Sequence, residues 1–225
     1  MRKSFSALAV AAVIMSAMLS ASCCGGCKSE PAAEGYAPSA ADTVSSVLVV
    51  VDVQRDFFSP EGSLYVNGSE ELPAKIAQIA GSFDAVIFTL DWHPGDHCSF
   101  KAQGGIWPSH CVAYTQGAGL ADEFAQILAQ GPDKVQLFFK GTDPQKEQYG
   151  AFEGLSEGRI SSWLKTAQKV AVCGIAGDYC VKESTKNILS IVPADKVTIL
   201  SDCIRSIDDG STITAFAAEN KLNQE

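Results

Sequence analysis

The chain contains only three histidines, and all three fall within one short stretch. His93 and His97 lie in the segment Asp91-Trp-His93-Pro-Gly-Asp-His97, and His110 follows in Trp107-Pro-Ser-His110. Imidazole and carboxylate groups are ligands that zinc, iron and manganese accept in proteins. One histidine alone is more often a surface or core residue, but the whole set beside Asp91 favours a site for one divalent transition metal.

Three further side chains of reactive type follow apolar runs that have the composition of buried strands. Asp52 and Lys140 come directly after such runs, and Cys180 follows a third run after a short glycine-containing turn. A carboxylate base, a cation and a thiol are the groups that acyl transfer through a cysteine requires. Each residue also has an ordinary interpretation: a capping aspartate, a solvated lysine at a strand end and a buried apolar cysteine. Their shared position after strands favours catalysis.

The position of Cys180 predicts an activated thiol. The segment Gly174-Ile-Ala-Gly-Asp-Tyr-Cys180 has the composition of a strand end, a tight turn and the first residue of a helix. Backbone N–H groups at a helix start favour an anion, so we expect the pKa of this thiol to be lowered. The same N–H groups are suited to hold the oxyanion that forms when a thiolate attacks a carbonyl carbon.

Five apolar runs alternate with segments of helical spacing, and this alternation predicts the fold. Buried parallel strands are near-continuous apolar runs, and strands joined through helices form right-handed crossovers. We therefore expect a three-layer α/β/α domain with a mostly parallel, Rossmann-like sheet of five to six strands, the last of them weak or missing. Ligands bind such sheets at the carboxyl ends of the strands, where the candidate residues fall. The predicted strands span residues 47–51, 85–90, 135–139, 169–174 and 197–200, and the predicted helices span residues 72–80, 120–129, 159–167, 180–190 and 211–220.

Taken together, these segments resemble the nicotinamidase/pyrazinamidase family of the isochorismatase-like cysteine hydrolases. The resemblance extends over residues 47–208, and the order and spacing of the motifs match the family. The Asp/Lys/Cys triad is typical of the whole superfamily, whereas the histidine segment with its later Trp-Pro-x-His is typical of the nicotinamidase branch. The matching motifs are Asp52-Val-Gln-Arg-Asp-Phe57, Asp91-Trp-His93-Pro-Gly-Asp-His97, Trp107-Pro-Ser-His110, Phe139-Lys140-Gly141, Tyr149-Gly-Ala-Phe and Gly174-Ile-Ala176-Gly-Asp-Tyr-Cys180.

The resemblance implies a role for each matching residue. Asp52, Lys140 and Cys180 are implied as the catalytic triad. The backbone N–H groups of Ala176 and Cys180 are implied as the oxyanion hole, with a cis peptide bond before Ala176. Two further sets are implied to bind the metal and the substrate. The implied metal ligands are Asp91, His93, His97 and His110, and the implied substrate contacts are Phe57, Trp107 and Tyr149.

The implied reaction is the deamidation of nicotinamide, and of pyrazinamide as well, through a thioester on Cys180. Two alternatives retain the same motifs: a related thiol hydrolase acting on another small amide, and a tethered metal- or nicotinamide-binding protein without turnover. The second gives no reason to keep the acid, the lysine and the thiol together. A purely structural lipoprotein would leave the concentrated histidines unexplained.

The charge of the chain argues against a nucleic-acid partner. The formal net charge is −9, and the lysines and arginines are scattered rather than gathered into a basic stripe. Eight cysteines are present, of which five fall in the predicted domain, so at least one of these five is a free thiol even in an oxidising compartment. Whether Cys98 pairs with Cys111, and whether copies of the chain form homo-oligomers, are questions that the sequence leaves open.

The N-terminal residues predict export and a lipid anchor. Arg2 and Lys3 precede a short apolar run, and small residues lead to Cys23, an arrangement that resembles a bacterial lipoprotein signal. We expect a signal peptide over residues 1–22, a lipid-anchor cysteine and flexible tether over residues 23–45, and the hydrolase domain over residues 46–225. The expected location is the periplasm or cell envelope, with membrane contact only through the lipid. Ordinary signal-peptidase cleavage after Ser22 is the alternative.

Overall fold

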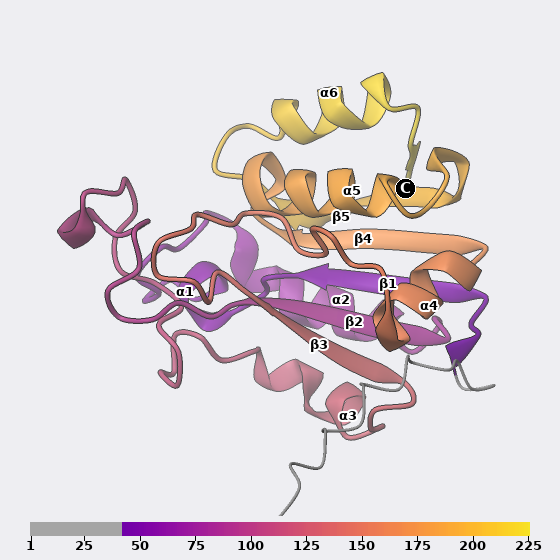
Figure 1. The fold of residues 1–225 in the computed structure, drawn as a ribbon, viewed down its shortest axis with the longest axis horizontal. Coiled ribbons are helices and arrows are strands. Elements are labelled where there is room, and N and C mark those ends of the chain that lie inside the picture. Colours follow the sequence, from indigo (N-terminus) through magenta and orange to yellow (C-terminus); the bar gives the residue numbers. More distant parts are fainter. Residues whose placement is uncertain (1–41) are drawn as a thin grey trace, which may run out of the picture. The chain divides into compact units, whose positions relative to one another are not determined.

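The computed structural model describes residues 42–225, which form a six-stranded sheet with helices on both faces (Figure 1). The strands run in the order β3-β2-β1-β4-β5-β6, and every neighbouring pair is parallel. The predicted architecture is therefore confirmed, with a short sixth strand. The strands are β1 (Ser46–Val51), β2 (Ala85–Asp91), β3 (Val135–Lys140), β4 (Lys169–Ile175), β5 (Val197–Arg205) and β6 (Asn223–Gln224).

The helices alternate with the strands along the chain. They are α1 (Arg55–Phe58), α2 (Leu72–Ala80), α3 (Ala125–Leu128), α4 (Gly158–Thr166), α5 (Lys182–Leu189) and α6 (Ser211–Glu219). Helix α4 lies in front of the sheet in Figure 1 and α2 lies behind it. The order in which successive strands are added reverses between the parallel neighbours β1 and β4, because the crossovers through α2 and α3 lead one way across the sheet and those through α4, α5 and α6 lead the other way. Such a reversal opens a crevice at the carboxyl ends of the two central strands.

Two predicted elements differ from those observed. Strand β5 continues to Arg205 instead of ending at residue 200, because its exposed Ser201 and Asp202 interrupt the apolar run without ending the strand. The predicted helix over residues 120–129 is a 3₁₀ turn, Asp122–Phe124, followed by the short α3. Apolar periodicity indicates a helical segment but does not separate the two types of helix.

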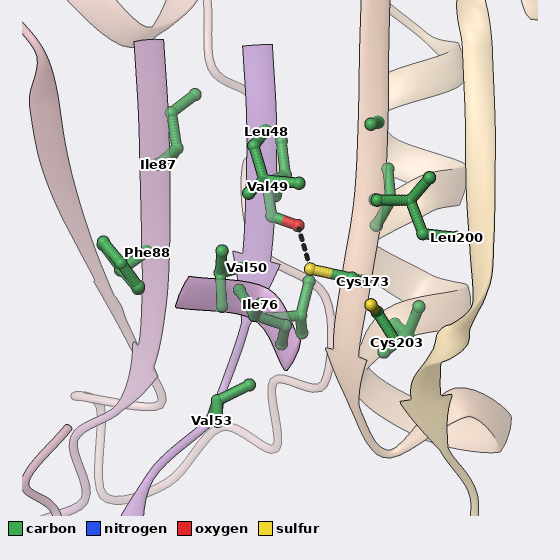
Figure 2. Packing of buried hydrophobic residues seen from close by; sticks show 14 of the residues in the cluster. Leu48, Val49, Val50, Val53, Ile76, Ile87, Phe88, Cys173, Leu200 and Cys203 are labelled. Atoms are coloured by element: carbon green, nitrogen blue, oxygen red, sulfur yellow. Dashed lines mark hydrogen bonds between the residues drawn. The ribbon is translucent and has the colours of Figure 1, made fainter. Parts of the chain in front are cut away.

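The core lies on both faces of the central strands. Residues 47–51 of β1 have no exposed surface, because β1 is paired with β2 on one side and β4 on the other. Figure 2 shows Val49 and Val50 packed between β2 and β4, with Cys173 donating a hydrogen bond to the carbonyl oxygen of Val49 at 3.6 Å. Cys173 and Cys203 are buried, as the sequence predicts for apolar cysteines. All five cysteines of residues 42–225, Cys98 and Cys111 included, are free thiols.

The packed domain begins a few residues before the predicted boundary. The carboxylate of Asp42 is buried and accepts a hydrogen bond from Arg159 of α4 at 2.7 Å. The backbone N–H groups of Val44 and Ser45 also bond to side chains of the domain. Residues 42–45 are therefore held against the domain, which corrects their assignment to the flexible tether. The predicted signal peptide, Cys23 and the rest of the tether lie outside the described residues.

Within residues 42–225, none of the helices combines the length and the apolar character that spanning a membrane requires.

Candidate active site

The fold brings the predicted catalytic and metal-binding side chains to one edge of the sheet. Asp52 directly follows β1, Asp91 ends β2 and Lys140 ends β3. Asp91 is the register partner of Lys140 across the two strands. Cys180 lies in the turn after β4. Strand β4 pairs with β1 on the side opposite β2. Four neighbouring parallel strands thus deliver residues that lie far apart in sequence to one crevice.

Lys140 lies at the centre of the site, with its side chain fully buried between two carboxylates. Its Nζ is 2.8 Å from Oδ2 of Asp52 and also donates a hydrogen bond to Oδ1 of Asp91. The Sγ atom of Cys180 lies 3.6 Å from the same nitrogen. Because the side chain of Lys140 has no exposed surface, the alternative of a solvated lysine at a strand end is wrong.

The electrostatics of the site follow from this shared ammonium. Burial opposes the charge on Lys140, but Asp52 and Asp91 raise the pKa of the ammonium well above its usual value. Burial likewise opposes ionisation of Asp91, yet the charge of Lys140 and contact with His93 lower the pKa of that carboxyl. For Asp52, burial outweighs Lys140 and the neighbouring Asp91 adds to it, so the pKa is raised. Of the two carboxyls, Asp52 is therefore the more ready to take up a proton.

Asp52 has one carboxylate oxygen committed to the fold and one available within the site. Oδ1 accepts a hydrogen bond from Oγ1 of Thr89 at 2.6 Å. Oδ2 pairs with Lys140 and accepts no further hydrogen bond from the residues that the structure describes. A carboxylate oxygen of Asp52 and the Sγ of Cys180 lie within 4.8 Å of each other. The residue adopts a left-handed φ of 51°, which is uncommon outside glycine, and its N–H bonds to the Thr89 carbonyl at 3.1 Å.

The resting state of Cys180 differs from the predicted one. The residue lies in a π-helical turn, Gly177–Val181, which precedes α5, and not in the first turn of an α-helix. Burial, with added repulsion from Asp52 and Asp91, outweighs the attraction of Lys140 and raises the pKa of the thiol well above its usual value. The prediction of a lowered pKa is therefore wrong. The peptide bond before Ala176 is cis, as the resemblance implies.

Three of the four predicted metal ligands come together. The ligand atoms of Asp91, His93 and His110 all lie within 4.8 Å of one another, and all three residues are buried. The Nδ1 atoms of His93 and His110 lie 2.9 and 2.8 Å from the backbone carbonyls of Gly141 and Pro108. A carbonyl accepts the proton of Nδ1, so each Nε2 keeps its lone pair and faces Asp91. Two imidazoles and a carboxylate with their outer partners in place fit a divalent transition metal.

His97, the fourth predicted ligand, lies beside this group but is not part of it. Its ring centroid is 4.1 Å from that of His93. Its Nδ1 accepts a hydrogen bond from the N–H of Ser99 at 3.3 Å, and its Nε2 lies 3.1 Å from the carbonyl oxygen of Lys146. Both ring nitrogens thus have hydrogen-bond partners in the protein, and His97 is not part of the ligand group that contains Asp91.

The predicted substrate contacts enclose a cavity between the thiol and the metal-ligand group. Phe57, Trp107 and Tyr149 line this cavity, whose wall also contains Ala176 and Cys180. The indole Nε1 of Trp107 donates a hydrogen bond to the hydroxyl of Tyr149 at 3.1 Å. The cavity is therefore lined largely by rigid aromatic surface, which suits a flat ring.

Five residues of the cavity wall were not predicted from the sequence, namely Leu64, Val66, Glu147, Tyr179 and Ile207. Tyr179 packs its ring against those of Trp107 and Tyr149, at centroid distances of 5.2 and 5.3 Å. Its position next to Cys180 was the available signal. Glu147 lines the same cavity from the loop after β3, and nothing in its surroundings in the sequence marks it.

Comparison with known proteins agrees with this arrangement. The isochorismatase domain family matches residues 46–221. The chain is 31% identical to the nicotinamidase of Saccharomyces cerevisiae over 212 residues, which cover 79% of this chain and 94% of that protein. It is 32% identical to the nicotinamidase/pyrazinamidase of Mycobacterium tuberculosis over 179 residues, or 75% of this chain and 91% of that protein. The chain belongs to the nicotinamidase family of the isochorismatase-like hydrolases.

Solved structures of the nicotinamidase family share the fold. PnC1 from L. infantum, in complex with nicotinate, superposes with a TM-score of 0.69 at 31% identity and covers 81% of this chain and 94% of its own. The pyrazinamidase of Pyrococcus horikoshii, in complex with zinc, gives a TM-score of 0.65 at 29% identity and covers 80% of this chain and 98% of its own. The chain is thus an amidohydrolase, and its donor set fits a divalent metal.

We predict that Lys140→Met destabilises the metal-free protein by about 3–5 kcal/mol, because the substitution leaves two buried carboxylates without their cation. Urea denaturation at neutral pH measures the effect.

The matched control for this prediction is Lys75→Met, which breaks an exposed ion pair with Glu71 at 2.9 Å. This change is expected to cost less than about 1 kcal/mol. Equal losses for the two variants would contradict the role given to Lys140.

Proposed function

We propose that the protein deamidates nicotinamide, and pyrazinamide as well, to the corresponding acid and ammonia through a thioester on Cys180. The observation that supports this most directly is the position of the thiol, 3.6 Å from a fully buried ammonium and in the wall of a cavity that the metal-ligand group also lines. Nicotinamidase relatives at about 30% identity support the same substrate.

The cavity suits a planar aromatic amide. Phe57 and Trp107 are proposed to flank the pyridine ring, with Tyr149 closing one side. In this orientation the carboxamide lies toward Cys180, and the ring nitrogen lies toward Asp91, His93 and His110, which line the same cavity. A divalent zinc, iron or manganese ion at these residues would supply a positive charge that engages the ring nitrogen, directly or through water.

His97 is proposed as a further ligand on the strength of the family resemblance. This role requires its Nε2 to exchange the carbonyl of Lys146, 3.1 Å away, for the metal.

Acylation begins with a neutral thiol. Asp52 accepts the proton of Cys180 as the sulfur attacks the carboxamide carbon, and Lys140 stabilises the thiolate as it forms. The oxyanion of the tetrahedral intermediate accepts hydrogen bonds from the backbone N–H groups of Ala176 and Cys180. Asp52 then returns the proton to the amide nitrogen, the carbon–nitrogen bond breaks, and ammonia leaves.

Deacylation reverses these roles with water as the nucleophile. Asp52 accepts a proton from the water that attacks the thioester carbon, and the carbon–sulfur bond breaks to release nicotinate. The proton returns to the sulfur of Cys180, which restores the resting thiol beside Lys140. A raised pKa for Asp52 is useful in both steps, because a carboxyl that is easily protonated is the better proton shuttle.

The main alternative of another class is a metal- or nicotinamide-binding protein without turnover. Such a protein has no need for a carboxylate, an ammonium and a thiol in mutual contact within the binding cavity, and a buried charged group is costly unless it serves a purpose. Catalysis is therefore favoured.

We predict that Cys180→Ala lowers ammonia release from nicotinamide by at least about a thousandfold, since the attacking atom is removed. Bound metal, measured by atomic absorption, is expected to remain at the wild-type level. The matched control is Cys203→Ala, which removes a thiol from β5 outside the cavity and is expected to retain activity. Turnover by Cys180→Ala near the wild-type rate would contradict the mechanism.

We further propose that the protein is exported to the periplasm or cell envelope and anchored by a lipid on Cys23. The support is the basic start, Arg2-Lys3, the apolar run over residues 6–18 and the small residues before Cys23. We predict that the wild-type protein, made in a bacterial host, separates with the membrane fraction and that Cys23→Ser releases it. Release of the wild-type protein under the same conditions would instead indicate ordinary signal-peptidase cleavage.

A further inference from the structure

The start of α1, from its N-cap Gln54 to Asp56, contacts the metal-ligand group through two side chains with no reactive role. The first is Gln54, whose side chain has no exposed surface. Its Nε2 donates hydrogen bonds to the backbone carbonyls of Asp91 at 2.8 Å and of Ala118 at 2.9 Å. Its Oε1 accepts a hydrogen bond from the backbone N–H of Asp91 at 2.7 Å. Gln54 therefore hydrogen-bonds to both the N–H and the carbonyl group of Asp91, the metal-ligand residue that ends β2.

The second side chain is Asp56, two residues further along and within α1. Its Oδ2 accepts a hydrogen bond from the backbone N–H of Cys111 at 2.7 Å. Cys111 directly follows His110, and its carbonyl accepts the backbone N–H of His93 at 3.1 Å. One carboxylate thus fixes a backbone position that is covalently joined to one histidine and hydrogen-bonded to the other.

The surrounding loop is shaped around the carboxylate of Asp56. A Cβ atom placed on Gly117 would overlap this carboxylate, so glycine permits the close approach. The backbone N–H of Asp56 donates to the carbonyl of Gly117 at 2.9 Å, and the backbone carbonyl of Asp56 accepts from Leu64 at 3.1 Å. The other carboxylate oxygen, Oδ1, accepts a hydrogen bond from the backbone N–H of Ser63 at 3.2 Å, so the carboxylate is held independently of its bond to Cys111.

We infer that Gln54 and Asp56 are positioning residues that preorganise the metal site. The inference rests on the proposed function, because it assigns a metal to Asp91, His93 and His110. Both residues closely follow Asp52, so the proton acceptor and the supports of the metal ligands share one short segment, residues 52–56. Loss of outer partners of metal ligands typically lowers metal affinity by about 10- to 100-fold, and losses in that range are expected here.

Ordinary structural hydrogen bonds would predict a different result, namely lower thermal stability with unchanged metal affinity. Asp84 provides the matched control. Its Oδ2 accepts hydrogen bonds from the backbone N–H groups of Ser45 and Ser46, at 3.0 and 2.9 Å, and from the Ser46 hydroxyl at 3.1 Å. These bonds join the starts of β1 and β2, at the opposite edge of the sheet from the site.

The experiment measures the zinc affinity of the purified protein by competition with a chromophoric chelator, in the absence of substrate, together with Tm. The variants are Gln54→Met, Asp56→Ala, Asp56→Asn and Asp84→Ala. Asp56→Asn keeps a side-chain oxygen that can accept from Cys111, so it is the conservative partner of Asp56→Ala. Activity on nicotinamide is measured separately with the wild-type protein, which keeps a failure of the proposed function distinct from a failure of this inference.

We expect Gln54→Met and Asp56→Ala to bind zinc at least about tenfold more weakly than the wild type. Asp56→Asn is expected to recover most of the loss, and Asp84→Ala, which removes the accepting oxygen, is expected to lower Tm while keeping wild-type affinity. Wild-type affinity in folded Gln54→Met and Asp56→Ala overturns the inference. If Gln54→Met does not fold, the comparison of Asp56→Ala with Asp56→Asn decides it, since equal zinc affinities for those two overturn the role of the carboxylate.

Discussion

The buried ammonium of Lys140 is the interaction on which the site depends. Two carboxylates from adjacent strand ends, Asp52 and Asp91, share this one cation in a region without solvent exposure. Two unpaired carboxylates would be very costly to bury there. One ammonium and two carboxylates leave this cluster with a net negative charge. The imidazoles beside Asp91 complete a donor set that fits a divalent cation. The catalytic and metal-binding halves of the pocket are therefore electrostatically one unit.

The parallel sheet makes this unit possible. The neighbouring strands β3, β2, β1 and β4 all end at the same edge of the sheet. Residues up to 128 positions apart in sequence, from Asp52 to Cys180, therefore meet without a long loop that must fold back. The reversal of strand order between β1 and β4 opens the crevice that holds the thiol and its proton acceptor. Rigid strands behind each residue hold the reacting groups in place, and this preorganisation is what thiol-based amide hydrolysis requires.

Much of this arrangement was predictable from the sequence, because it depends on patterns that are local in the chain. Apolar, β-branched runs identified the strands, and the residue types after them identified the chemistry. Properties that depend on three-dimensional surroundings were not predictable. The raised pKa of the Cys180 thiol results from burial together with Asp52 and Asp91, whereas position before a helix alone had indicated a lowered one.

The limits were similar for the hydrogen-bond partners. The family resemblance implied four ligands, but it carries no information on the carbonyl of Lys146 beside the Nε2 of His97. The hydrogen bonds of Gln54 to the backbone of Asp91 join segments 37 residues apart, and nothing in the local sequence of either segment predicts them. Side-chain chemistry can be inferred from residue type and order, whereas the partner of each polar atom requires the fold.

The measurement that tests this account most directly is a titration of metal-free protein with zinc, followed by ammonia release from nicotinamide at each step. The account predicts no turnover after chelation, then activity that rises in proportion to bound zinc and stops rising at one ion per chain. Nicotinamide turnover by the metal-free protein at the rate of the zinc-loaded protein would contradict the claim that the thiol and the metal-ligand group form one active site.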